Sequence, residues 1–183
     1  MKIILASNSP RRKELLSKNN IDFEIIKSNV DEVIDLKKTV LENVMELAKI
    51  KCLDVYNKNI DRVVLAADTI VALDNKIYGK PKNEDDAFKM LEELSDNTHE
   101  VITAVCVASS KGIDVDYSIS KVTFKKMSKE EIKEYIDTKE PMDKAGSYAI
   151  QGIGSKFILS YDGEFDNIVG LPMKLVLEML KKH

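Results

Sequence analysis

The chain has little of the material from which common catalytic and metal sites are built. Among its 183 residues it has two histidines, His99 and His183, and two cysteines, Cys52 and Cys106. The cysteines lie far apart without metal-type spacing, and each lies in an apolar pattern, which predicts buried free thiols. Catalytic triads that need histidine, and zinc clusters, are therefore disfavoured. Any chemistry has to depend on carboxylates and amines.

A surplus of one charge and long apolar runs are also missing. The 28 Lys and Arg residues nearly balance the 31 Asp and Glu residues, giving a net charge of −3. A general nucleic-acid binder needs a basic surplus, so we expect no nucleic-acid partner. No apolar run approaches the roughly 20 residues of a membrane span. Polar Ser7-Asn8-Ser9 interrupts the first apolar run, unlike a signal peptide. We therefore expect a cytoplasmic protein with no membrane partner.

Two familiar nucleotide-binding motifs are absent as well. The sequence contains no G-x-x-x-x-G-K-[ST], which excludes a Walker-type phosphate loop. Gly152-Ile153-Gly154 lacks a third glycine in register and follows no clear strand, so it does not predict a dinucleotide-binding turn. A phosphate site would have to be built differently.

Short apolar runs alternate with amphipathic segments, which is typical of an α/β protein. Asp74-Asn75 predicts a hairpin turn, Asn83 predicts a helix N-cap, and Ser128 with Glu131 predicts a capping box. A glycine-containing loop is expected at 145–155. Strands are predicted at 3–6, 23–27, 63–73, 76–78, 98–109, 115–124 and 157–161, and helices at 10–18, 40–55, 84–94, after 128 and from 172.

The start of the first predicted helix carries charges that oppose its dipole. Arg11, Arg12 and Lys13 occupy the first turn, where each cation costs about 0.3–1 kcal/mol. A bound phosphate would reverse the sign of that effect. With the hydroxyls of Ser7 and Ser9, of which Ser9 is the expected N-cap, the turn predicts an anion site. The alternative is a solvated basic turn that tolerates the cost.

Three further charged residues lie at unusual positions. Asp68 interrupts the apolar run 63–73, where a general base, a metal ligand or a structural aspartate bonded to a turn would each explain it. Lys51 projects into the apolar arc of its helix, either to snorkel or to reach a phosphate. Lys80, in Gly79-Lys80-Pro81, is either an ordinary turn lysine or a residue of the same site.

Seven ordered motifs together resemble the Maf family of nucleoside triphosphate pyrophosphatases, once described as septum-formation inhibitors. The resemblance covers essentially the full chain, so residues 1–183 are predicted to form a single Maf-like domain. The motifs are Leu5-Ala6-Ser7-Asn8-Ser9-Pro10-Arg11-Arg12, Val30-Asp31-Glu32, Leu47-Ala48-Lys49-Ile50-Lys51, Ala67-Asp68-Thr69-Ile70-Val71, Gly79-Lys80-Pro81, Tyr148-Ala149-Ile150-Gln151-Gly152 and Ile168-Val169-Gly170-Leu171-Pro172.

The resemblance implies hydrolysis between the α- and β-phosphates of a nucleoside triphosphate, with a divalent cation, Mg²⁺ or Mn²⁺. It places Asp68 at the proton-acceptor position. Arg11, Thr69 and Gln151 match the positions that sort substrates and resemble the branch that takes dTTP and UTP. The remaining polar residues of the family's pocket correspond to Ser9, Arg12, Glu32, Lys51 and Lys80.

These roles give a working hypothesis for the site. Ser9, Arg11, Arg12 and Lys51 hold the triphosphate, and Lys80 stabilises charge on the leaving pyrophosphate. Glu32 with Asp68 holds the cation through oxygen ligands, although spacing leaves open whether Asp68 is the base or a ligand. The Gln151 amide reads part of a pyrimidine edge.

The expected fold is an elongated mixed β-sheet flanked by helices, of the Maf/ITPase type, with two lobes and a central cleft. Two other functions stay open: a nucleotide-sensing regulatory protein involved in septum formation, and a pyrophosphatase for methylated or damaged nucleotides. A homodimer is a further expectation, but the sequence has no exposed stripe that requires one.

Overall fold

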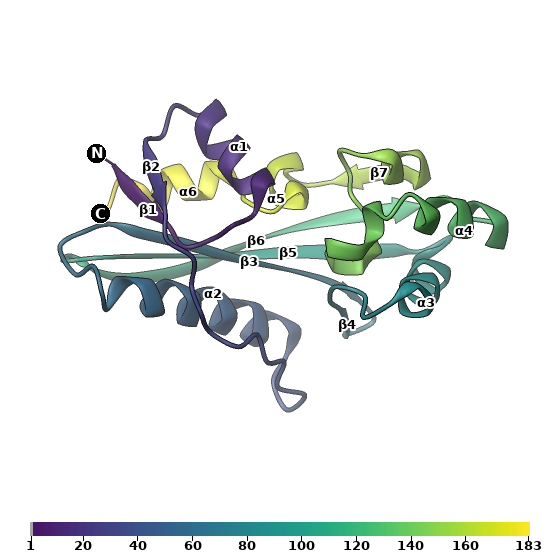
Figure 1. Ribbon diagram of the computed structural model, residues 1–183, viewed down its shortest axis with the longest axis horizontal. Helices are drawn as coiled ribbons and strands as arrows, with labels where there is room; N and C mark the ends of the chain where they lie inside the picture. The colour runs from purple at the N-terminus through teal and green to yellow at the C-terminus, as the bar shows by residue number, and fades with distance from the viewer. Residues whose placement is uncertain (1) are drawn as a thin grey trace. The chain divides into compact units, whose positions relative to one another are not determined.

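Seven strands form one mixed β-sheet in the computed structural model, which describes residues 2–183. The strand order is β2-β1-β3-β5-β6-β7, and β4 pairs with β3 off this path. Figure 1 shows the strands with helices around them. The strands are β1 (Ile3–Leu5), β2 (Phe23–Ile25), β3 (Val64–Leu73), β4 (Lys76–Tyr78), β5 (Thr98–Ser109), β6 (Gly112–Phe124) and β7 (Ile158–Asp162).

Six α-helices and three short 3-10 helices connect the strands within residues 2–183. The α-helices are α1 (Pro10–Lys18), α2 (Val40–Tyr56), α3 (Glu84–Leu94), α4 (Lys129–Asp137), α5 (Phe165–Val169) and α6 (Met173–Leu180), and the 3-10 helices are η1 (Glu140–Asp143), η2 (Ala145–Ser147) and η3 (Ile153–Phe157). The predicted α/β class with a mixed sheet is therefore confirmed.

The chain divides into two compact units. Unit 1 comprises Met1–Thr69, Thr103–Ser118 and Phe165–His183, and unit 2 comprises Ile70–Ile102 and Ile119–Glu164. The long strands β3, β5 and β6 each contribute residues to both units. The two predicted lobes correspond to this division, whereas the cleft and the assignment to a single domain stay predictions.

Three strands of unit 1 pair in parallel and have helices on both faces. β1 pairs in parallel with β2 on one side and with the start of β3 on the other. In Figure 1, α2 lies on one face of these strands and α1 and α6 lie on the other. The fully buried side chains of Leu5, Leu65 and Val44 lie in the core of this unit. Burial on both faces explains why β1 and the start of β3 read as continuous apolar runs rather than as an alternation.

Unit 2 contains two antiparallel strand pairs and most of the aromatic core. β4 returns along the end of β3, and β7 pairs with β6. The turn between β3 and β4 falls on Asp74 and Asn75, both with positive φ of 50° and 64°, as its residue types predict. Two T-shaped aromatic groups fill the interior, one of Tyr135 and Phe157 and one of His99, Phe124 and Tyr148.

Most of the predicted helix starts are confirmed, but the predicted capping hydrogen bond of one helix is wrong. Asn83 caps α3, and Ser128 and Glu131 form the expected capping box of α4. Helix α1 starts at Pro10 as predicted, but the Ser9 side chain makes no capping hydrogen bond within the described chain. Instead, the backbone amide of Ser9 donates to the Ser7 hydroxyl at 3.2 Å. This hydrogen bond lies within the turn between β1 and α1. The capping box of α2, formed by Thr39 and Glu42, was not predicted.

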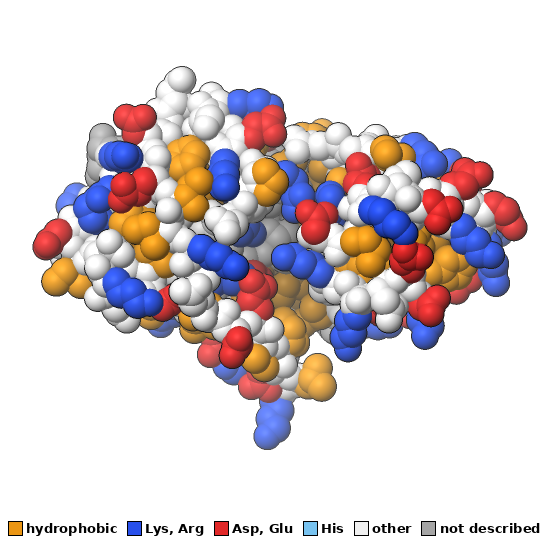
Figure 2. All heavy atoms as spheres, in the orientation of Figure 1, with side chains coloured by type: hydrophobic (Ala, Val, Ile, Leu, Met, Phe, Trp, Pro, Cys, Tyr) orange, Lys and Arg blue, Asp and Glu red, His pale blue; other side chains and the backbone are white. Residues whose placement is uncertain are grey.

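Other differences are small. β6 begins at Gly112, three residues before the predicted start, and the short helix α5 precedes the expected last helix, which begins at Met173 after Pro172. Within residues 2–183, none of the helices has the length and apolar character needed to cross a membrane. Acidic and basic side chains are interspersed over the face shown in Figure 2, in keeping with the near-zero charge balance.

Candidate active site

The candidate site of unit 1 is built where β3 runs beyond the end of β1. β1 pairs with β3 only as far as Leu65, and the chain after β1 then turns through Ser7 and Ser9 into α1. The next residues of β3 are Ala66 to Thr69, so their edge does not face β1. Backbone groups left in this way need other partners.

Arg12 supplies one such partner. Its guanidinium donates four hydrogen bonds, to the carbonyls of Gly170 and Ala67, both at 2.8 Å, and to the hydroxyls of Ser7 at 3.3 Å and Thr69 at 3.2 Å. A guanidinium has five N–H groups. Within residues 2–183 four of them have these partners, so one N–H of Arg12 remains to bind a ligand. Burial lowers the pKa of Arg12, and the nearby charge of Asp68 offsets part of this effect.

Gly170 permits this contact. Its φ is +122°, which disfavours other residues, and a Cβ there would lie 3.5 Å from the Thr69 hydroxyl and 3.9 Å from Nε of Arg12. The turn after α5 can therefore bring its carbonyl onto the guanidinium. The sequence motif around Gly170 thus has a structural role in holding Arg12.

Thr69 lies in a directed chain of hydroxyls. Thr103 donates to the carbonyl of Asn167 at 3.0 Å, so its oxygen is left to accept from the Thr69 hydroxyl, 3.0 Å away. Thr69 in turn accepts from Arg12. The orientation of the Thr69 hydroxyl is thereby fixed from both sides. Thr103 was not among the predicted site residues, and its position inside an apolar strand was the available signal.

On the other face of β3, Lys51 lies between two carboxylates. Successive residues of a strand point to opposite faces, so Asp68 points away from Thr69 and toward α2. The Lys51 ammonium lies 2.5 Å from Oδ1 of Asp68 and 2.9 Å from Oε1 of Glu32. Lys51 and Asp68 are 9% and 6% exposed, whereas Glu32 is exposed. Lys51 therefore does not snorkel to water, and Asp68 is paired within the site.

The environment of Asp68 changes its acidity in two opposing ways. Burial raises its pKa, while the charges of Lys51 and Arg12 lower it, and the raising effect is the larger one. A carboxylate with a raised pKa is a stronger base than an exposed aspartate. Asp68 is thus a buried, ion-paired base candidate.

The predicted residues of unit 1 are found around these two faces of β3. Ser7 accepts from Arg12 and from the amide of Ser9, while Arg11 lies half-buried in the first turn of α1. Arg12 therefore places positive charge of this turn against β3. Eight of the predicted residues belong to unit 1: Ser7, Ser9, Arg11, Arg12, Glu32, Lys51, Asp68 and Thr69.

The other two predicted residues, Lys80 and Gln151, belong to unit 2. Both side chains are exposed. The amide of Gly146 donates to the carbonyl of Gly79 at 3.1 Å, so the loop that bears Gln151 is joined to the turn that bears Lys80. Sequence spacing had not connected these two segments.

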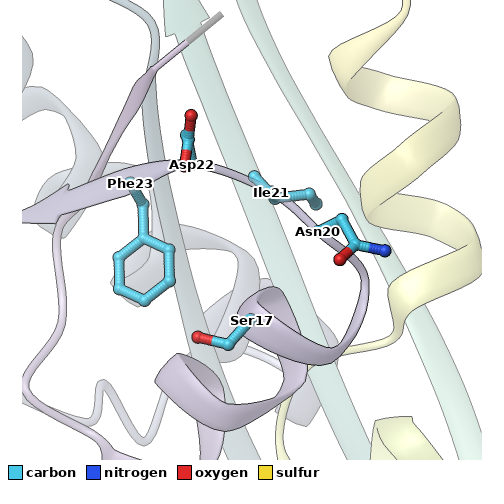
Figure 3. Close-up of a pocket in the computed structure, with 5 residues that line it drawn as sticks. All are labelled: Ser17, Asn20, Ile21, Asp22 and Phe23. Atoms are coloured by element: carbon cyan, nitrogen blue, oxygen red, sulfur yellow. The ribbon is translucent and has the colours of Figure 1, made fainter.

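An open depression elsewhere in unit 1 contains none of the predicted residues. Its lining comes from the last turn of α1 and from the segment that ends at the first residue of β2. Figure 3 shows the lining residues Ser17, Asn20, Ile21, Asp22 and Phe23. It has an acidic side chain, Asp22, and no basic one in its lining. That chemistry does not suit a polyanion.

Comparison with known proteins identifies the family. Residues 2–183 match the Maf family, described as "Maf-like protein". The chain belongs to the Maf family. Its sequence is 52% identical to a dTTP/UTP pyrophosphatase of Caldicellulosiruptor bescii, covering 99% of this chain and 94% of the relative. A dTTP/UTP pyrophosphatase of Acholeplasma laidlawii is 49% identical, with 98% and 95% covered.

A solved structure supports the fold of this Maf-family chain. The Staphylococcus aureus Ham1 protein superposes with a TM-score of 0.52 at 13% sequence identity, covering 99% of this chain and 98% of that protein. At this identity the likeness concerns the fold alone. The predicted membership in the Maf family and the predicted ITPase-like fold class are both confirmed.

Proposed function

We propose that this Maf-family chain is a nucleoside triphosphate pyrophosphatase that converts dTTP and UTP to the monophosphate and pyrophosphate. The observation that carries the proposal is that relatives 44–52% identical over nearly the full chain bear this name. The geometry of unit 1 agrees with it, because cationic groups and a buried carboxylate converge on one stretch of β3.

The chain's own residues suit hydrolysis at the α-phosphorus. A water oxygen attacks the α-phosphorus, the bond to the bridging oxygen of the β-phosphate breaks, and pyrophosphate leaves with that electron pair. Asp68 takes the proton of the attacking water, for which its raised pKa suits it. Lys51, the free N–H of Arg12 and the first turn of α1 bind phosphate oxygens. Lys80 stabilises the charge of the leaving group.

A divalent cation fits the donor set of Glu32 and Asp68. Their oxygens both approach one cationic centre, the Lys51 ammonium, and carboxylate oxygens are the ligands that Mg²⁺ and Mn²⁺ prefer. Within residues 2–183 no group of three or more His, Cys, Asp or Glu side chains could hold a metal ion. Phosphate oxygens and water would therefore complete the coordination. When bound, such a cation neutralises charge that develops on the phosphates.

A nucleotide panel tests the proposal. We expect pyrophosphate release from dTTP and UTP, in preference to other nucleotides, and loss of release when EDTA removes divalent cations. Preference for a methylated guanine nucleotide would support the methylated-nucleotide alternative instead. Binding of nucleotides without pyrophosphate release would support a sensing protein and contradict the proposal.

We also expect the protein to act in the cytoplasm, where free nucleotides occur. The two cysteines are free and buried, which suits a reducing compartment. The homodimer stays an expectation, which light scattering of the purified protein tests directly.

A further inference from the structure

Gln151 lies in a loop with little regular structure of its own. The loop, residues 145–155, contains the short turn η2 and the start of η3, and residues 148–152 between them belong to no helix or strand. The Gln151 side chain is exposed. A side chain that selects a base has to be held in one place, so the support must come from neighbouring elements.

The carboxylate of Glu140 provides such support. It accepts three hydrogen bonds, from the amide of Ile153 at 2.9 Å, the amide of Gly154 at 2.9 Å and the hydroxyl of Tyr135 at 2.6 Å. Partial burial raises the pKa of Glu140, but these hydrogen bonds outweigh that effect and hold the pKa below its usual value. The group is therefore an ionised acceptor for two consecutive amides just after Gln151.

Tyr135 extends the support to the other side of Gln151. Its hydroxyl accepts from the amide of Ala149 at 3.3 Å while it donates to Glu140. The ring is fully buried against Phe157 in the core of unit 2. Through Tyr135 and Glu140 the loop is thus held at Ala149, two residues before Gln151, and at 153–154, two to three residues after it.

The two glycines of the loop fit this arrangement. A Cβ on Gly152 would lie 1.9 Å from Oε1 of Glu140, and one on Gly154 would lie 2.5 Å from the Tyr135 hydroxyl oxygen. Both distances exclude a side chain unless Glu140 or Tyr135 moves. Gly152 and Gly154, which match no dinucleotide motif, therefore permit the close approach of Glu140 and Tyr135 to the loop backbone.

We propose that Glu140 and Tyr135 are positioning residues for base selection, which fix the loop backbone on both sides of Gln151 so that its amide meets the pyrimidine in one orientation. This inference rests on the proposed function, because it assigns base selection to Gln151. Neither residue is required to touch the substrate.

Glu140→Gln tests the inference with little change of shape. A glutamine amide has one acceptor oxygen and a donor group, so at least one of the loop amides loses its acceptor. We expect KM for UTP and dTTP to rise about tenfold while kcat stays within about twofold, the size of one lost charge-assisted hydrogen bond. Hydrogen exchange of residues 152–155 should accelerate. Tyr135→Phe should act in the same direction. The double variant should show a larger rise in KM than either single variant, because it releases the loop at Ala149 as well as at 153–154.

Matched controls separate positioning from general damage. Glu134→Gln, at an exposed position of α4, should leave KM and loop exchange unchanged. Inorganic triphosphate has no base, so its inhibition constant should be the same for Glu140→Gln and the wild type. Should Glu140→Gln fail to fold, Tyr135→Phe alone gives the same readouts.

Three results would overturn the inference. The first is an unchanged KM and base preference in Glu140→Gln despite faster loop exchange. The second is an equal rise in the inhibition constant of inorganic triphosphate, which would indicate general damage. The third is a changed base preference in Gln151→Ala with none in Glu140→Gln, which leaves the proposed function standing. Failure of the proposed function is recognised separately, since the wild type would then release no pyrophosphate from UTP or dTTP.

Discussion

Unit 1 and unit 2 hold their candidate functional residues by different means. In unit 1, charged side chains contact one another directly: Lys51 lies between Asp68 and Glu32, and Arg12 bonds two carbonyls and two hydroxyls. In unit 2, the Gln151 side chain is exposed, and its loop is held by backbone amides that donate to Tyr135 and Glu140. The groups that we propose for phosphate chemistry are thus fixed by their own charges, whereas the group that we propose for base selection is fixed indirectly.

The largest effect is expected from Asp68→Asn, which removes one of the charges that hold the unit 1 residues together. If the charge of Asp68 carries the chemistry, kcat for UTP should fall at least about 100-fold, as expected when a general base is removed. UTP binding, measured by calorimetry, should remain detectable, because the cationic groups are unchanged. Asp61→Asn, at an exposed position of the same unit, should keep full activity. Retention of more than a tenth of kcat in Asp68→Asn would contradict the role.

Arg12→Lys tests whether the charged groups of unit 1 also hold the fold. A lysine cannot reach all four acceptors in the geometry of a guanidinium, so the carbonyls of Ala67 and Gly170 would not both be satisfied. We expect the free energy of unfolding in urea to fall by about 2–3 kcal/mol. Arg62→Lys, which alters an ion pair with Glu24, should cost less than about 1 kcal/mol. Equal losses in the two variants would mean that Arg12 has no special structural role.

His99 gives the corresponding test in unit 2. Its ring is buried beside Tyr148, with Nε2 2.7 Å from the Tyr148 hydroxyl, and burial lowers its pKa to about 4. The unfolded chain binds the proton more readily, with a pKa of about 6.5. Stability from this group is therefore complete above about pH 6.5, falls as the pH drops toward 4 and changes no further below that.

Between pH 7 and pH 5 the loss from His99 should be about 2 kcal/mol. Urea unfolding at both pH values measures it, and subtraction of the same difference for His99→Gln removes the contribution of the carboxylates. Parallel pH dependence in the two proteins would show that His99 is not buried in its neutral form. Unit 2 would then lack one of the neutral contacts that distinguish it from unit 1.

Local features of the fold were the most predictable from the sequence. Asp74-Asn75 and the Ser128–Glu131 capping box act within four residues, so the residue types alone determine the geometry. Thr39 and Glu42 form the same kind of box, and the same spacing could have revealed it. The predicted capping hydrogen bond of Ser9 is wrong, because the residue type alone does not determine which group its hydroxyl contacts.

The candidate site was predictable only where a residue conflicts with its surroundings. Asp68 and Lys51 interrupt apolar patterns, and they prove to be partners across 17 residues of sequence. Glu140 gave no such signal, because a glutamate beside Lys139 and Pro141 resembles any surface turn. Its carboxylate accepts from the amides of Ile153 and Gly154, and backbone amides have no sequence signature.

The two cysteines give unit 1 a reporter that unit 2 does not have. Cys52 on α2 and Cys106 on β5 have no exposed surface, and the neighbouring Cys106 thiol and burial raise the pKa of Cys52. A thiol reagent can therefore modify them only after α2 separates from the strands beneath it. With no other cysteine in the sequence, the labelling rate measures how often this half of the enzyme opens.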